Sequence, residues 1–90
     1  MIYKLFAVKD KALDSYSAPF TQATIEAGIR MWRDLVLYGQ EENRYRRSPE
    51  DYCLYMLGEF DDSTGQTTPA VPVRLASANE VLAENTTEGN

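Results

Sequence analysis

The chain has no histidine and a single cysteine among its 90 residues. Without histidine it cannot build a Ser-His or Cys-His nucleophile pair, or the usual zinc sites. One cysteine excludes an internal disulfide, so the chain is not a small secreted domain held together by disulfides. Its cysteine content is consistent with a reducing compartment. Cys53 lies within an apolar stretch, where a small core residue is expected rather than a nucleophile. We therefore expect no catalytic residues.

Long apolar runs are absent as well. The N-terminal segment MIYKLFAVKD is apolar but contains Lys4 and Lys9. It is too short and too charged for a signal peptide or a membrane span. We expect a soluble, cytoplasmic protein with no membrane partner.

Positive charge is scarce: nine Lys and Arg stand against 14 Asp and Glu, and the net charge is −5. Residues 1–60 hold eight basic and nine acidic groups, whereas residues 61–90 hold one and five. This balance argues against strong non-specific DNA binding. A local basic patch can still act, because charges are screened only beyond a Debye length of about 8 Å.

Apolar periodicity predicts one amphipathic helix from about residue 22 to residue 38. Thr21 is the expected N-cap, and Gly39 the expected stop in a left-handed conformation. Gly28 costs about 1 kcal/mol relative to Ala in a helix interior, so we expect it to permit a close approach to another element. The apolar stripe follows the i, i+4, i+7, i+11 spacing and consists of Ile25, Ile29, Trp32 and Val36.

Three segments have the composition of strands: 2–8, 52–60 and 70–75. The second is apolar on both sides and is expected at the centre of a sheet. The third contains Pro72, which lacks an N–H donor, and is expected at an edge. We interpret the segments between them, from residue 9 to 19 and from 40 to 51, as loops, the second ending in a single helical turn that opens at Ser48-Pro49.

Ser77 and Glu80 have the spacing of a capping box, which predicts a short C-terminal helix. The fold class expected is thus a small two-layer α+β domain. About three mainly antiparallel strands carry one amphipathic helix on one face, with the short helix at the C-terminal end. The domain is expected over residues 1–83, and residues 84–90 as a flexible acidic tail.

The segment GEFDDSTGQ places Glu59, Asp61 and Asp62 within four positions. Metal and general-acid sites need carboxylates that converge from separated positions, and the register does not fit a calcium loop. Asp and Ser at a turn entry bond their own backbone, and Gly65 takes a positive φ. We interpret the segment as a hairpin bend and expect no metal or cofactor.

The basic segment NRYRR is the best candidate for contact with a single strand. Arginine neutralises phosphate, and a base stacks on tyrosine with about 1–3 kcal/mol. The candidate residues are Arg30, Arg33, Arg44, Tyr45, Arg46 and Arg47. The alternative is a solvated loop whose arginines pair with nearby acids, and residue chemistry alone favours it. Those acids are Glu41, Glu42, Glu50 and Asp51.

The order of segments resembles the small nonstructural protein of gokushovirus-type microviruses, which are single-stranded DNA phages. The matching stretches are AVKD, APF, AGIRMWRDLV and SPEDYCLYMLGEFDDSTGQ, and the likeness covers about residues 1–75. The resemblance implies a role in viral DNA replication, or in single-strand synthesis and packaging, in the cytoplasm of the infected bacterial host. The resemblance implies no catalytic residues. With it, single-stranded DNA binding by the basic segment and a solvated loop become equally supported interpretations.

Two further expectations concern partners. The face of the sheet opposite the helix has aromatic content that suits a protein partner better than water, so we expect a homodimer or higher oligomer. The alternative to DNA binding is a protein interaction module that acts on a host or viral replication protein without nucleic-acid contact. The net acidic charge favours that alternative.

Overall fold

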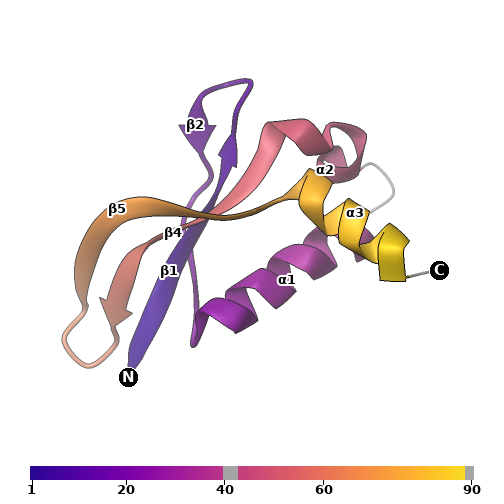
Figure 1. Ribbon diagram of the computed structural model, residues 1–90. Helices are drawn as coiled ribbons and strands as arrows, with labels where there is room; N and C mark the ends of the chain where they lie inside the picture. Colours follow the sequence, from indigo (N-terminus) through magenta and orange to yellow (C-terminus); the bar gives the residue numbers. More distant parts are fainter. Residues whose placement is uncertain (40–42, 89–90) are drawn as a thin grey trace.

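The computed structural model of the protein describes residues 1–39 and 43–88 (Figure 1). A curled sheet has α1 on one face, and α2 and α3 lie at one end of the molecule. The elements in chain order are β1 (Ile2–Asp10), β2 (Ser15–Tyr16), β3 (Phe20–Gln22), α1 (Ile25–Tyr38), α2 (Arg44–Arg47), the 3-10 helix η1 (Pro49–Asp51), β4 (Tyr52–Asp61), β5 (Gln66–Ser77) and α3 (Ala78–Glu88).

Across this described part of the chain the sheet has five antiparallel strands in the order β2-β1-β4-β5, with β3 also paired to β1. The predicted fold class, a two-layer domain with about three strands, was therefore wrong. The molecule is mostly sheet, curled like half a barrel, with helices added. The two missed strands have two and three residues, too few to show an alternating pattern. They form because one edge of β1 is free to pair with them. Ser17 bonds to the same edge: its N–H donates to the Val8 carbonyl, and its hydroxyl accepts from the Val8 N–H.

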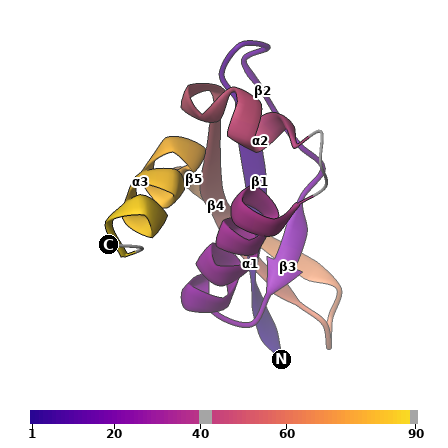
Figure 2. The ribbon, with the colours of Figure 1, turned by 90° about the vertical axis from the view of Figure 1, so that its right-hand side faces the viewer.

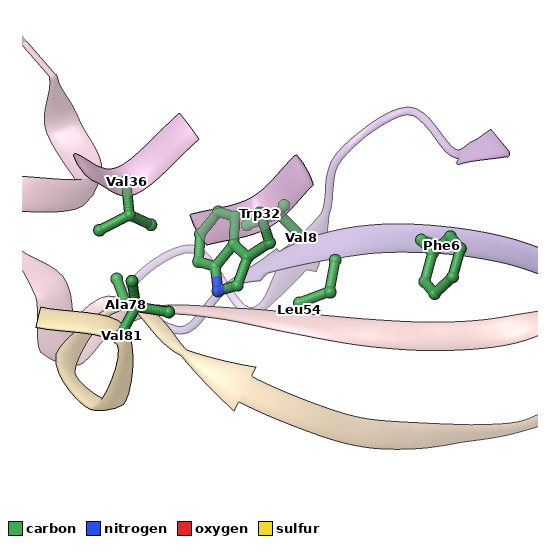
Figure 3. Packing of buried hydrophobic residues seen from close by; sticks show 7 residues of the cluster. All are labelled: Phe6, Val8, Trp32, Val36, Leu54, Ala78 and Val81. Atoms are coloured by element: carbon green, nitrogen blue, oxygen red, sulfur yellow. The ribbon is translucent and has the colours of Figure 1, made fainter. Parts of the chain in front are cut away.

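The core lies between the sheet and the helices (Figure 3). Val8 and Leu54 lie beside Trp32 of α1, Phe6 lies further along β1, and all four are buried. Of the predicted stripe of α1, Trp32 and Val36 are buried in the cluster and Ile29 packs against it. α3 closes the cluster with Ala78 and Val81. Figure 2 shows α3 and β3 on opposite sides of α1. The expected close approach at Gly28 is confirmed, because a Cβ there would lie 2.3 Å from the Phe6 ring atom Cζ.

Both ends of α1 differ from prediction. Thr24, not Thr21, is the N-cap, and its side-chain oxygen accepts a hydrogen bond from the Ala27 N–H at 3.0 Å. The N-cap lies three residues later than predicted, because Thr21 is part of β3. Gly39 does end the helix, but with a φ of −67° rather than a left-handed one. Glycine is required there for space, since a Cβ would lie 2.4 Å from Nδ2 of Asn43.

The predictions for the two long strands of the second half are confirmed. β4 lies between β1 and β5, and β5 is at the edge. A hairpin joins them over the segment with the acidic cluster, and Gly65 has a φ of 74°. The pairing register between β4 and β5 shifts near Gly58, whose φ is 148°. A Cβ at this position would collide with the Thr68 carbonyl oxygen.

The capping box of α3 is also confirmed. The Ser77 hydroxyl accepts from the Glu80 N–H at 3.1 Å, and the Glu80 carboxylate accepts from the Ser77 N–H at 3.2 Å. α3 continues to Glu88 and takes in most of the segment expected as a tail, of which residues 89–90 lie outside the described residues. No helix in the described part of the chain is long and apolar enough to cross a membrane.

Candidate nucleic-acid interface

The basic segment forms a single helical turn, α2, rather than a loop. Asn43 caps it, with the side-chain Oδ1 accepting a hydrogen bond from the Tyr45 N–H at 2.9 Å. Arg44, Arg46 and Arg47 are all exposed on this turn. Glu41 and Glu42, two of the acids expected to pair with these arginines, lie outside the described residues. α2 thus presents three guanidinium groups to solvent from four consecutive positions.

Tyr45 points the other way, into the protein. Its ring meets the Trp32 ring edge to face with centroids 4.9 Å apart, and meets the Tyr52 ring in the same manner at 5.1 Å. It packs against the core cluster. The guanidinium carbon of Arg44 lies 5.9 Å from the centroid of the same ring. In this geometry Tyr45 anchors α2, and the anchoring turns the flanking arginines outward.

The two arginines of α1 occupy a different environment. Arg30 and Arg33 line a hollow of about 530 Å³ together with Glu26 and Asp34, so basic and acidic groups alternate there. Arg44 lines another hollow, between α2 and the β1–β2 hairpin. The predicted set of site residues is thus divided between two surfaces of the molecule.

The acidic cluster is engaged locally. Oδ1 of Asp61 accepts hydrogen bonds from the Ser63 N–H at 2.9 Å and from its hydroxyl at 2.7 Å, and these bonds lower the pKa of Asp61. Glu59 pairs with the Lys4 ammonium at 2.6 Å. Asp62 pairs with the N-terminal ammonium at 2.6 Å and raises the pKa of that group. Asp61 therefore bonds the backbone of the bend, as predicted, whereas Glu59 and Asp62 connect the hairpin to the start of β1.

A second basic surface, which was not among the predicted sites, lies on the face of the sheet opposite α1. Residues alternate across a strand, so Lys9 and Tyr55 lie on the face opposite Val8 and Leu54. A hollow of about 410 Å³ opens there, lined by Lys9, Lys11, Glu50, Asp51, Cys53, Tyr55, Arg74, Ser77 and Asn79. The period-2 pattern of β1 and β4 contained this signal, but the pairing of Tyr55 with Arg74 depends on bulges that no pattern reveals.

Neighbouring groups set the charge states in this hollow, the sheet-face hollow. Burial raises the pKa of the Cys53 thiol. Asp14 accepts a hydrogen bond from the Lys9 ammonium and raises its pKa, and the two groups are 3.4 Å apart. Glu80 does the same to Arg74. The thiol is thus held in its neutral form, and the two cations in their charged form.

A family model described as Phage ORF5 protein matches residues 3–81 of this chain. The chain belongs to the Phage ORF5 protein family. Protein ORF5 of Chlamydia phage 1 is 30% identical over 84 residues, which cover 89% of this chain and 88% of that relative. The match confirms the resemblance to a small gokushovirus-type microvirus protein that the residues indicated. No solved structure matches the chain. The part of the chain that the Phage ORF5 model matches contains both α2 and the sheet-face hollow.

Proposed function

We propose that this Phage ORF5 family member is a non-enzymatic accessory protein that binds single-stranded DNA during viral replication, or during single-strand synthesis and packaging, in the host cytoplasm. The observation that carries the proposal is the geometry of α2. Tyr45 is anchored between two core rings, and Arg44, Arg46 and Arg47 project outward around it. Membership of a family found in a microvirus supports the choice of nucleic acid.

This geometry favours contact with the phosphate backbone. Guanidinium groups bind phosphates in a bidentate manner, whichever base follows. Tyr45 is committed to the core, so α2 supplies charge without a stacking ring. The interface at α2 is therefore expected to bind without sequence preference and to weaken as salt rises.

The test is a fluorescence anisotropy titration of the full chain with a labelled oligothymidylate of about 20 nucleotides, long enough for one small binding site. The double variant Arg46→Ala with Arg47→Ala is expected to weaken binding at low salt. It should also lower the slope of log affinity against log salt by about 0.7 for each phosphate that the variant no longer neutralises.

A matched control removes the same charge elsewhere. Arg30→Ala with Arg33→Ala takes two cations from the hollow that Glu26 and Asp34 share. A smaller loss of affinity is expected, because every residue that lines this hollow belongs to α1 and none to α2. If both double variants reduce affinity equally, overall charge and not α2 governs binding. A parent chain that binds no oligonucleotide at low salt would overturn the proposal.

The alternative function is an interaction with a host or viral replication protein. It is favoured by the apolar end of α1, where Tyr38 is 76% exposed and Leu35 37%. Affinity capture from infected cells, with and without nuclease, separates the two functions. Partners that persist after nuclease and are no longer captured by Tyr38→Ser with Leu35→Ser support the alternative.

A further inference from the structure

We infer that the sheet-face hollow is where bases of the bound single strand stack, with the strand's phosphates held by Lys9, Lys11 and Arg74. This rests on the proposed function, and it assigns to the sheet the base contacts that α2 does not supply. The hollow of about 410 Å³ is open on the face that α1 leaves uncovered.

The element that follows the basic turn in the chain lines the hollow. η1 follows α2 with only Ser48 between them. The Lys11 N–H donates to the carbonyl of Asp51, the last residue of η1, at 2.7 Å. η1 carries Glu50 and Asp51, so a strand that contacts both α2 and the sheet is expected to keep its phosphates away from these two carboxylates.

An aromatic pair marks the place for a base. The rings of Tyr16 and Tyr55 meet edge to face with centroids 5.6 Å apart. Tyr16 is 42% exposed, and the Lys9 ammonium lies 5.5 Å from its centroid. In contrast to Tyr45, these tyrosines lie on the uncovered face, where a ring can accept a base. A paired base has both faces stacked on its neighbours, so such a platform selects single strands.

The charges around the rings suit a phosphate backbone. Three basic side chains and two acidic ones line the hollow, in a chain whose net charge is −5. Lys9 and Arg74 have carboxylate partners at exposed positions, and Asp14 is 87% exposed. Such exposed ion pairs are weak because water screens them, so a phosphate can replace the carboxylate at little cost. Glu50 and Asp51 both belong to η1, which directs the phosphates toward Lys9 and Arg74.

The test compares two probes on the full chain: the labelled oligothymidylate and an abasic strand of equal length, which keeps the phosphates but has no bases. The parent is expected to prefer the strand with bases. Tyr55→Leu should weaken binding of that strand by at least about fivefold and abolish the preference, since stacking on one ring is worth about 1–3 kcal/mol. Tyr55→Phe keeps the ring and should bind within about twofold of the parent.

A charge variant tests the phosphate contact independently. Glu80→Gln preserves the capping box with Ser77 but frees Arg74 of its carboxylate partner, so it should raise affinity for both probes. Arg74→Ala should lower affinity for both. Trp32 fluorescence in each variant confirms that the core is intact, because this single tryptophan is fully buried.

The outcomes separate the two proposals. If the parent binds both probes equally, or if Tyr55→Leu binds like the parent, the stacking site is wrong. Weaker binding by Arg46→Ala with Arg47→Ala would then leave α2 as the whole interface. If the parent binds neither probe, both proposals fall.

Discussion

The joint between α1 and α2 is held by Asn43, a polar residue that is only 8% exposed. Its amide nitrogen Nδ2 donates to the carbonyls of Leu35 at 2.6 Å and Val36 at 3.2 Å, in the last turn of α1. Its Oδ1 accepts from the Tyr45 N–H at 2.9 Å, in the first turn of α2. Terminal helix groups of both kinds lack partners within their own helix. We therefore predict that Asn43→Ala strongly destabilises the protein.

The size of the effect follows from these three bonds. Each intramolecular hydrogen bond contributes about 1 kcal/mol net, and a buried group left without a partner costs about 1–3 kcal/mol. The hydrogen bond to the Leu35 carbonyl is part-buried, and the one to the Val36 carbonyl is buried. Water can therefore replace the lost donor more easily at Leu35 than at Val36. We expect a decrease of about 2–4 kcal/mol in a free energy of unfolding that totals about 5–15 kcal/mol. The melting temperature should then fall by roughly 10–25 °C.

The assay is urea unfolding followed by the fluorescence of Trp32, which is buried in the core and in contact with Tyr45. The midpoint should fall without a change in slope, as for a pure loss of stability. Asn79→Ala is the matched control, because Asn79 is an exposed asparagine in the first turn of α3. Its effect should stay within about 0.5 kcal/mol.

Asn43→Asp sharpens the test. The carboxylate can still accept from the Tyr45 N–H, but it turns an acceptor toward two carbonyls that need a donor. The aspartate should cost at least as much as alanine at neutral pH, and the cost should shrink as the pH falls and the carboxyl becomes a donor. A destabilisation below about 1 kcal/mol for Asn43→Ala, or an Asp variant that is insensitive to pH, would refute the reasoning.

Three other outcomes are expected. Gly28→Ala should destabilise the protein by about 1–3 kcal/mol in urea unfolding despite alanine's better helix propensity, because the new Cβ would collide with Phe6; a stabilised variant would contradict this. The hydrogen bond from Arg74, and next the one from the Ser77 N–H, lower the pKa of Glu80 below its ordinary value of 4.5. The Glu80 carboxylate therefore stabilises the fold above pH 4.5, and this stabilisation disappears as the pH falls through the lowered pKa. Glu80→Gln should thus be less stable than the parent at pH 7 and match it in strong acid, as urea midpoints across pH would show. Sedimentation equilibrium tests the oligomer expected from the aromatic content of the sheet face opposite α1. Because that face cannot pack against a second subunit and accept bases at once, a monomer of 10.2 kDa at every concentration would contradict the oligomer and leave the face open to a strand.

Elements whose cause is local or periodic could be predicted from the order of the amino acids alone. The stripe of α1 reaches Trp32 and Val36 at helical spacing, and only one face of a helix with that spacing can be buried. β4 is apolar on both sides and became central, and Pro72 keeps β5 at the edge because it has no N–H to share. The capping box of α3 needs only residues three positions apart.

Features that depend on residues distant in the chain could not be predicted in this way, because they arise only when the chain folds. β2 and β3 exist because β1 has an edge to pair with, and a strand of two or three residues carries no pattern of its own. Tyr45 points inward because Trp32 and Tyr52, on other elements of the fold, leave room for its ring. The sheet-face hollow depends on the pairing of Tyr55 with Arg74, which bulges shift out of any simple register. Local preference is written residue by residue, whereas packing is a property of pairs that meet only when the chain has folded.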